Sequence, residues 1–210
     1  MFGIHDLGLF IVSGLLLNIM PGPDSLLIMT RSATQGARAG CTAALGIGAG
    51  VFIHVFAAAI GLSAILATSA TAFTVVKYIG AAYILYMAIG LLRSKPRDAV
   101  AATAVAPLPY RKIFAQGFLT NVLNPKVAIF FLAFVPQFIN ADAPHKALAF
   151  IVLGCIFNLN GMLWCNALAL FTAHASARLK VSPLVSLWLN RATGGLFVWL
   201  GVKLAMAKTT

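Results

Sequence analysis

The sequence predicts an all-α membrane protein with about six transmembrane helices in two inverted three-helix repeats, in which helices one and four are interrupted. The first observation is composition: 61% of the 210 residues are hydrophobic and 9% are charged, whereas a soluble domain carries about 25% charged residues. The second is a mean hydropathy of +0.96, which reflects long apolar segments joined by short connections. The third is a proline-containing motif in the first and in the fourth of these segments.

Six apolar segments are long enough to cross a bilayer, which takes about 20 mostly apolar residues per helix. They run over roughly 5–30, 40–67, 71–92, 113–139, 146–173 and 184–207. A hydrophilic connector with prolines and mixed charge follows the third segment. We therefore expect a single membrane-embedded domain over 1–210, with a first half of 1–92, a cytoplasmic linker of 93–112 and a second half of 113–210. The first segment lacks a preceding basic region, so we expect it to be retained as a span.

Basic residues predict the orientation. Fifteen lysines and arginines against four acids give a net charge of +11. Cytoplasmic loops carry the excess of Lys and Arg, so we expect connectors one–two, three–four and five–six in the cytoplasm and both termini outside. This explanation also makes a nucleic-acid partner unnecessary. Ten bases fall in those connectors and four on the other side, the ten being Arg31, Arg38, Arg93, Lys95, Arg97, Arg111, Lys112, Arg178, Lys180 and Arg191, and the four Lys77, Lys146, Lys203 and Lys208.

The first segment is broken at Asn18, Pro21, Gly22, Pro23 and Asp24. Proline removes a backbone donor and clashes with the preceding turn, and irregular backbone at membrane depth survives only inside protein or beside a wet cavity. The order Gly-Pro-Asp predicts a new helix start, because proline suits the first turn and an acid there complements the helix dipole. An acid within a span also indicates function.

The frame of this break recurs in the fourth segment. Gly14 and Asn18 are four residues apart, as are Gly117 and Asn121, and two apolar residues follow each asparagine. After one gap, Pro23 aligns with Pro125 and Asp24 with Lys126. Inverted halves with interrupted helices in corresponding positions indicate the midplane site of a transporter.

Asp24 and Lys126 carry opposite charges in apolar spans, where a charge normally pairs or binds something charged. One hypothesis is a static salt bridge between the two broken helices. The other is a shared cavity, in which Asp24 takes an ammonium group or a proton and Lys126, or a half-helix N-terminus, takes a carboxylate. Because Asn18, Asn121 and Asn124 can both donate and accept hydrogen bonds, they suit a substrate and loose backbone equally.

Other polar residues at membrane depth leave alternatives open. His54 lies near the middle of the second segment, where it is either a packing residue or a proton relay together with Asp24. Asn158 and Asn166 are eight residues apart and share a helix face. They serve hydrogen bonding between helices or line the transport path.

Small residues in the second segment predict close helix packing. Gly46, Gly48 and Gly50, like Gly36 and Gly40 before them, have the spacing that lets helices approach. No strand precedes them, so they form no dinucleotide loop and we expect no cofactor. The three cysteines, Cys41, Cys155 and Cys165, have no metal-binding spacing, so we expect no metal site.

These motifs resemble the lysine exporter superfamily, most closely its homoserine/threonine resistance (RhtB-type) branch. The resemblance covers essentially the whole chain and rests on the two motifs around Asp24 and Lys126 and on the glycines that open the second segment. It implies a multi-pass, bacterial inner-membrane secondary transporter that exports amino acids or related metabolites of the homoserine, threonine or lysine type by proton antiport. A homodimer is compatible with the packing glycines. The resemblance assigns to the site Pro21, Gly22, Pro23, Asp24, Asn121, Asn124, Pro125 and Lys126.

Other functions need residues that are scarce in this sequence. An ion or metal exporter on the same scaffold needs soft or multiple acidic ligands, and one intramembrane acid is present. A thiol-redox protein needs paired cysteines near the breaks. An intramembrane enzyme needs an acid–base or metal cluster, so we expect no enzymatic activity.

Overall fold

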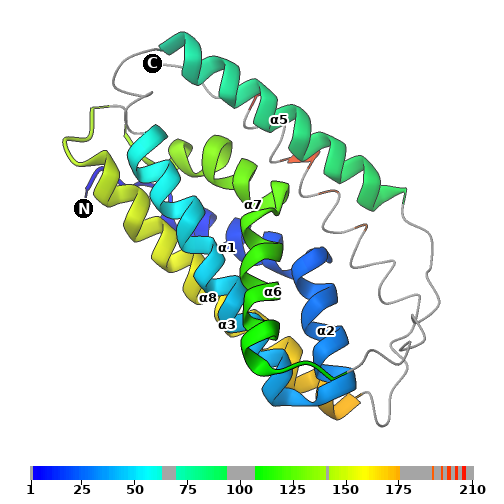
Figure 1. Cartoon of the computed structure of the whole chain (residues 1–210). Helices are drawn as coiled ribbons and strands as arrows, with labels where there is room; N and C mark the ends of the chain where they lie inside the picture. The colour runs from blue at the N-terminus through cyan, green and yellow to red at the C-terminus, as the bar shows by residue number, and fades with distance from the viewer. Residues whose placement is uncertain are drawn as a thin grey trace.

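The computed structural model describes residues 2–62, 70–93, 107–140 and 142–175, together with single positions between 191 and 206. Within these ranges the chain is helical, and its β structure is an isolated bridge between Ile4 and Ile139 (Figure 1). The prediction of an all-α protein is therefore confirmed.

The first predicted span is two helices, α1 (Leu7–Ile19) and α2 (Pro23–Gln35), bent by 55° at the break. Gly22 is the N-cap of α2, Pro23 begins the helix and Asp24 lies in its first turn. This is the helix start that the sequence predicts. Because Pro23 has no N–H to donate, a new helix can begin here without losing a backbone hydrogen bond.

The first connector is shorter than the sequence predicts. Helix α2 continues to Gln35, and α3 (Ala37–Ala57) follows after Gly36, whose φ of 82° favours glycine. A Cβ at Gly36 would meet no neighbour, so the prediction of close packing there is wrong. Arg31 is not a connector residue, because it is buried within α2 and donates to the side chains of Gln35 and Gln116.

The fourth predicted span is also broken. Helix α6 (Tyr110–Val122) ends before Asn124, and α7 (Pro125–Ile129) continues through the π-helical η2 (Phe130–Phe134) and the 3-10 helix η3 (Val135–Phe138). The two parts are bent by 46°. Asn124 is the N-cap of α7, and its Oδ1 accepts from the Lys126 backbone N–H at 3.0 Å. Both interruptions therefore have the same design, with a proline at the restart.

Three further elements complete the described bundle. Helix α3 continues into the π-helical η1 (Ala58–Leu62), α5 spans Ala70–Leu92 and α8 spans Lys146–Ala175. Within the described ranges, two helices are long and apolar enough to cross a membrane, or up to four if each bent pair is one span. Most of the predicted sixth span and residues 94–106 of the predicted linker lie outside the described residues.

Glycines allow α3 to pack tightly against α6. A Cβ at Gly46 would collide with the Phe114 carbonyl oxygen, and one at Gly50 would lie 2.9 Å from the Asn121 Cβ. A Cβ at Gly117 of α6 would in turn collide with the backbone of α3. The predicted packing role of Gly46 and Gly50 is confirmed, and this contact places Asn121 directly beside α3.

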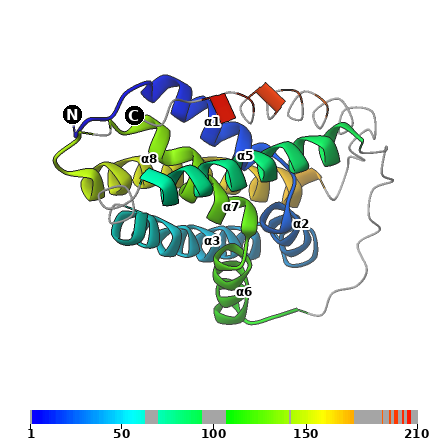
Figure 2. The same ribbon diagram turned by 90° about the horizontal axis from the view of Figure 1, so that it is seen from above.

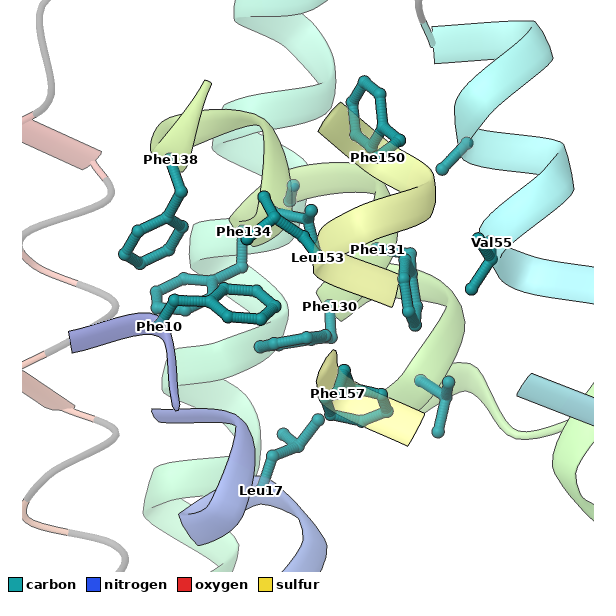
Figure 3. Packing of buried hydrophobic residues seen from close by; sticks show 14 of the residues in the cluster. Phe10, Leu17, Val55, Phe130, Phe131, Phe134, Phe138, Phe150, Leu153 and Phe157 are labelled. Carbon is teal, nitrogen blue, oxygen red and sulfur yellow. The ribbon is translucent and has the colours of Figure 1, made fainter. Parts of the chain in front are cut away.

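An aromatic cluster holds the second part of the broken fourth span between α1 and α8. Figure 3 shows Phe10 of α1, Phe130 and Phe138, and Phe157 of α8 directed toward one another. Ring centroids are 4.8 Å apart between Phe130 and Phe157 and 5.2 Å apart between Phe10 and Phe138. Such aromatic pairs contribute roughly 0.5–1.5 kcal/mol beyond their buried area. The cluster therefore anchors η2 and η3 against α1 and α8.

The figures show which helices are neighbours and which helix ends lie at the same end of the bundle. In Figure 2, α3 and α8 lie side by side, with α1 on one side of this pair and α6 on the other. In Figure 1, the α2–α3 junction, the start of α6 and the end of α8 lie toward one end of the bundle. Hydrogen bonds between Gln35 and the Leu108 backbone join α2 to the segment before α6 at this end. The bases Arg38, Arg111 and Lys112 therefore belong to the same end, as the orientation argument requires.

Candidate functional site

The Asp24 carboxylate is held by the opposite break. Its Oδ2 accepts from Asn121 Nδ2 at 2.9 Å and from Asn124 Nδ2 at 3.0 Å. Hydrogen bonds to an ionised acceptor are roughly twice as strong as neutral ones. An acid at the start of α2 is thus fixed by two amides from the interruption between α6 and α7.

The Lys126 ammonium is held by the first break in the reciprocal way. Its Nζ donates to the backbone oxygens of Leu17 at 3.0 Å and Met20 at 3.2 Å. These carbonyls belong to the last turn and C-cap of α1, where helical partners are missing and a cation is favourable. The side chain is buried, and the Cβ position of Gly22 lies 3.4 Å from Nζ.

The two charges do not form a salt bridge with each other. An ion pair does form between His5 and Asp6, at the exposed start of α1. Asp24 and Lys126 instead contact neutral groups. The hypothesis of a static salt bridge is therefore wrong for this conformation, and the exchange of partners between the two charges stays a prediction.

A small cavity of ≈ 20 Å³ lies between these groups. By the same measure a water molecule needs about 10–15 Å³, so the cavity holds one water-sized group. Its polar lining residues are Asn18, Asp24, Ser25, Asn121, Lys126 and Asn158. The remaining lining comes from α3, α7 and α8, namely Ile47, Gly48, Val51, Val127, Phe157, Gly161, Met162 and Cys165.

Three buried polar atoms of the lining residues lack a hydrogen-bond partner among the described residues. They are Asp24 Oδ1, Asn121 Oδ1 and Asn18 Nδ2. Leaving such a group unsatisfied costs about 1–3 kcal/mol, and more when it is charged. Two acceptors and one donor are therefore open at one cavity, which indicates a site for a polar ligand.

The predicted substrate-binding residues divide into three groups. Asn18, Asp24, Asn121 and Lys126 come together around the cavity. Asn124 lies behind them, where it bonds Asp24 and caps α7. The remaining residues, Pro21, Gly22, Pro23 and Pro125, shape the two breaks and do not line the cavity.

His54 is connected to the site through Asn121. Its Nε2 lies 2.9 Å from the Asn121 carbonyl oxygen, and its ring stacks on Phe131 with centroids 6.4 Å apart. Because a carbonyl oxygen only accepts, Nε2 carries a proton in this arrangement. His54 is buried but does not line the cavity, so its role as a proton relay stays a prediction.

Most of the cavity lining that α3 and α8 contribute was not predicted from the sequence. Of the two asparagines predicted to share a face, Asn158 lines the cavity, whereas Asn166 Nδ2 donates to the Met162 carbonyl of its own helix at 2.8 Å. Gly48 and Gly161 also line it. These lining residues could have been found in the sequence from the pattern of glycines and an asparagine, Asn158, within apolar segments.

A sequence profile of the LysE type translocator family matches residues 15–208. The chain is 31% identical to an uncharacterized membrane protein of Pseudomonas aeruginosa over 98% of its own length and 97% of the relative's. It is 30% identical to the membrane protein YrhP of Bacillus subtilis, over 97% of this chain and 100% of the relative. It is 26% identical to a leucine efflux protein of Salmonella typhimurium, over 97% of this chain and 96% of the relative.

No solved structure matches the chain. The membrane-protein relatives and the long apolar helices agree with each other, and they make this chain a multi-pass membrane protein. The profile covers the breaks of both interrupted helices and every described residue that lines the cavity. The chain therefore belongs to the LysE type translocator family.

Proposed function

We propose that this protein is a proton-driven secondary transporter that exports amino acids or related metabolites across the bacterial inner membrane, as a member of the homoserine/threonine resistance branch. Its six helices would form two inverted halves, 1–92 and 113–210, joined by the cytoplasmic linker 93–112. The leucine efflux relative supports amino acids as the cargo. The two broken helices support a transport site between the first and fourth spans.

One observation carries the proposal: an acid and a base, each on a broken helix, border the same cavity. An amino-acid zwitterion has an ammonium group and a carboxylate close together. Its ammonium would take the open Oδ1 of Asp24, and its carboxylate would take Lys126 Nζ. Asn18 and Asn121 would satisfy the remaining hydrogen bonds with their open amide atoms.

Transport requires the halves to separate, because the cavity as described holds one water-sized group. Lys126 would leave the carbonyls of Leu17 and Met20 when a substrate carboxylate replaces them. Those two carbonyls terminate α1, so occupation of the site is coupled to the angle between α1 and α2. Rocking of one half against the other would then expose the site to the opposite side.

Proton coupling is assigned to Asp24. It is the acid among the residues that line the cavity, and one of its oxygens is free to accept a proton. A proton on Asp24 removes the charge that attracts the substrate ammonium. Protonation from outside would therefore release the substrate, and deprotonation toward the cytoplasm would restore the site.

The proposal is tested by export from cells preloaded with dipeptides, with every amino acid in the medium measured over time. Cells with the wild-type protein should release one or more amino acids faster than cells without it. Asp24→Asn should abolish this difference, whereas Asp6→Asn, an exposed acid on the same span, should preserve it. Protein levels in the membrane are measured for each variant.

Two results would contradict parts of the proposal. If no amino acid shows differential efflux with wild-type protein, amino acids are not the cargo. If Asp24→Asn exports normally with an unchanged dependence on pH, Asp24 does not couple protons to export.

A further inference from the structure

The charges of the cavity come from two of the helices that line it. Asp24 on α2 and Lys126 on α7 are the charged side chains among the described lining residues. The lining residues of α3 and α8 are uncharged and include Ile47, Val51 and Met162. Besides its two charged groups, the cavity therefore has a largely apolar α3–α8 wall.

Two glycines on the apolar wall determine how much room it leaves. A Cβ at Gly48 would lie 2.6 Å from Met162 Sδ, and a Cβ at Gly161 would lie 3.2 Å from Asn18 Oδ1. A larger residue at either position would require Met162 or Asn18, both of which line the cavity, to shift. The sulfur of Met162 itself can move, because methionine is unbranched and flexible.

A zwitterion whose two charges are held by Asp24 and Lys126 leaves the uncharged lining of α3 and α8 for its side chain. The hydrogen-bonding side chains that α3 and α8 contribute to the described lining are the Asn158 amide and the Cys165 thiol, and neither helix contributes a carboxylate to it. A second ammonium group, as in lysine, would be buried there without a counter-charge, which is strongly unfavourable. A carboxylate side chain would meet the same obstacle.

Resting on the proposed function, we infer that the exported amino acid has an uncharged side chain, and that the α3–α8 wall around Gly161, Met162 and Asn158 selects it. A missing methylene in an apolar pocket changes selectivity by about 10–200-fold. Burying an unpaired charge is more unfavourable than losing one methylene contact, so it changes selectivity by a larger factor. The wall therefore discriminates first by charge and then by size.

The test uses the full-length protein in liposomes loaded with equal concentrations of alanine, leucine, lysine and glutamate, with release of each measured. Wild-type protein should release the neutral amino acids at least tenfold faster than lysine or glutamate. Asn158→Asp places a carboxylate on the wall with almost no change in volume. It should raise the release of lysine relative to leucine at least tenfold.

A matched control lies on the same helix. Asn166→Asp makes the same chemical change two turns away, at a residue that bonds its own helix and does not line the cavity. Its ratio of lysine to leucine release should equal that of the wild type. If Asn158→Asp does not fold, Gly161→Ala is the second variant, and it should lower the release of leucine relative to alanine at least tenfold.

The outcomes separate this inference from the proposed function. If wild-type protein releases lysine as fast as leucine, the inference is overturned while the proposed function stands. If it releases none of the four amino acids although it is folded, and cells preloaded with dipeptides show no differential efflux of any amino acid, the proposed function fails. Asn158→Asp or Gly161→Ala protein that transports with wild-type ratios would remove the wall's assigned role.

Discussion

Lys126→Met tests whether the ammonium group stabilises the break in α1. Methionine retains an unbranched apolar side chain but loses both hydrogen bonds, to Leu17 O and Met20 O. A hydrogen bond to a charged group contributes about 1.5–3 kcal/mol, so two such bonds contribute roughly 3–6 kcal/mol. The carbonyls that remain are buried and have no helical partner. We therefore expect a loss of at least about 3 kcal/mol in the free energy of unfolding.

The assay is thermal unfolding of the purified protein in detergent. For a chain of this size, each 1 kcal/mol shifts Tm by about 2–4 °C, so the minimum loss of about 3 kcal/mol lowers Tm by roughly 6–12 °C and a larger loss lowers it further. Lys112→Met is the matched control, because Lys112 is exposed at the start of α6 and should leave Tm unchanged. A Lys126→Met protein with the Tm of the wild type would refute the capping role that the structure assigns to this lysine.

Two further changes test neighbouring contacts. Gly46→Ala would place a Cβ against the Phe114 carbonyl and should destabilise the α3–α6 contact by about 1–3 kcal/mol; in the same thermal assay Gly8→Ala, where a Cβ meets nothing, should have little effect. At His54, glutamine can still donate to the Asn121 carbonyl and should preserve amino-acid efflux, whereas His54→Phe removes the donor and should reduce it. Loss of efflux in both variants would instead show that the imidazole itself is needed, as a proton relay requires.

The interruptions of the helices could be predicted from the sequence because their cause is local. Proline lacks an N–H wherever it stands, so Pro23 and Pro125 mark helix starts without reference to any neighbour. The charges of Asp24 and Lys126 were also informative alone, because a charge in an apolar segment requires a partner. The repeat then placed these residues at one site, and the structure brings both to one cavity.

The roles of some residues depend on tertiary contacts and could not be predicted from the sequence. Arg31 was expected in a connector because the first apolar segment ends near residue 30, yet Gln35 and Gln116 accept its hydrogen bonds within the bundle. Gly36 resembles a packing glycine in sequence, but its positive φ makes it a turn residue. In both cases the same residue type serves two purposes, and the neighbours decide between them.

By itself the sequence determined a helical membrane protein with two broken spans and one intramembrane charge on each. Only the tertiary structure decided that the two charges avoid each other, Asp24 with two amides and Lys126 with the end of α1. It also decided that α3 and α8 form the uncharged wall of the cavity. The physical reason is that composition and proline act along the chain, whereas a hydrogen-bond partner or a cavity wall exists only once distant helices pack together.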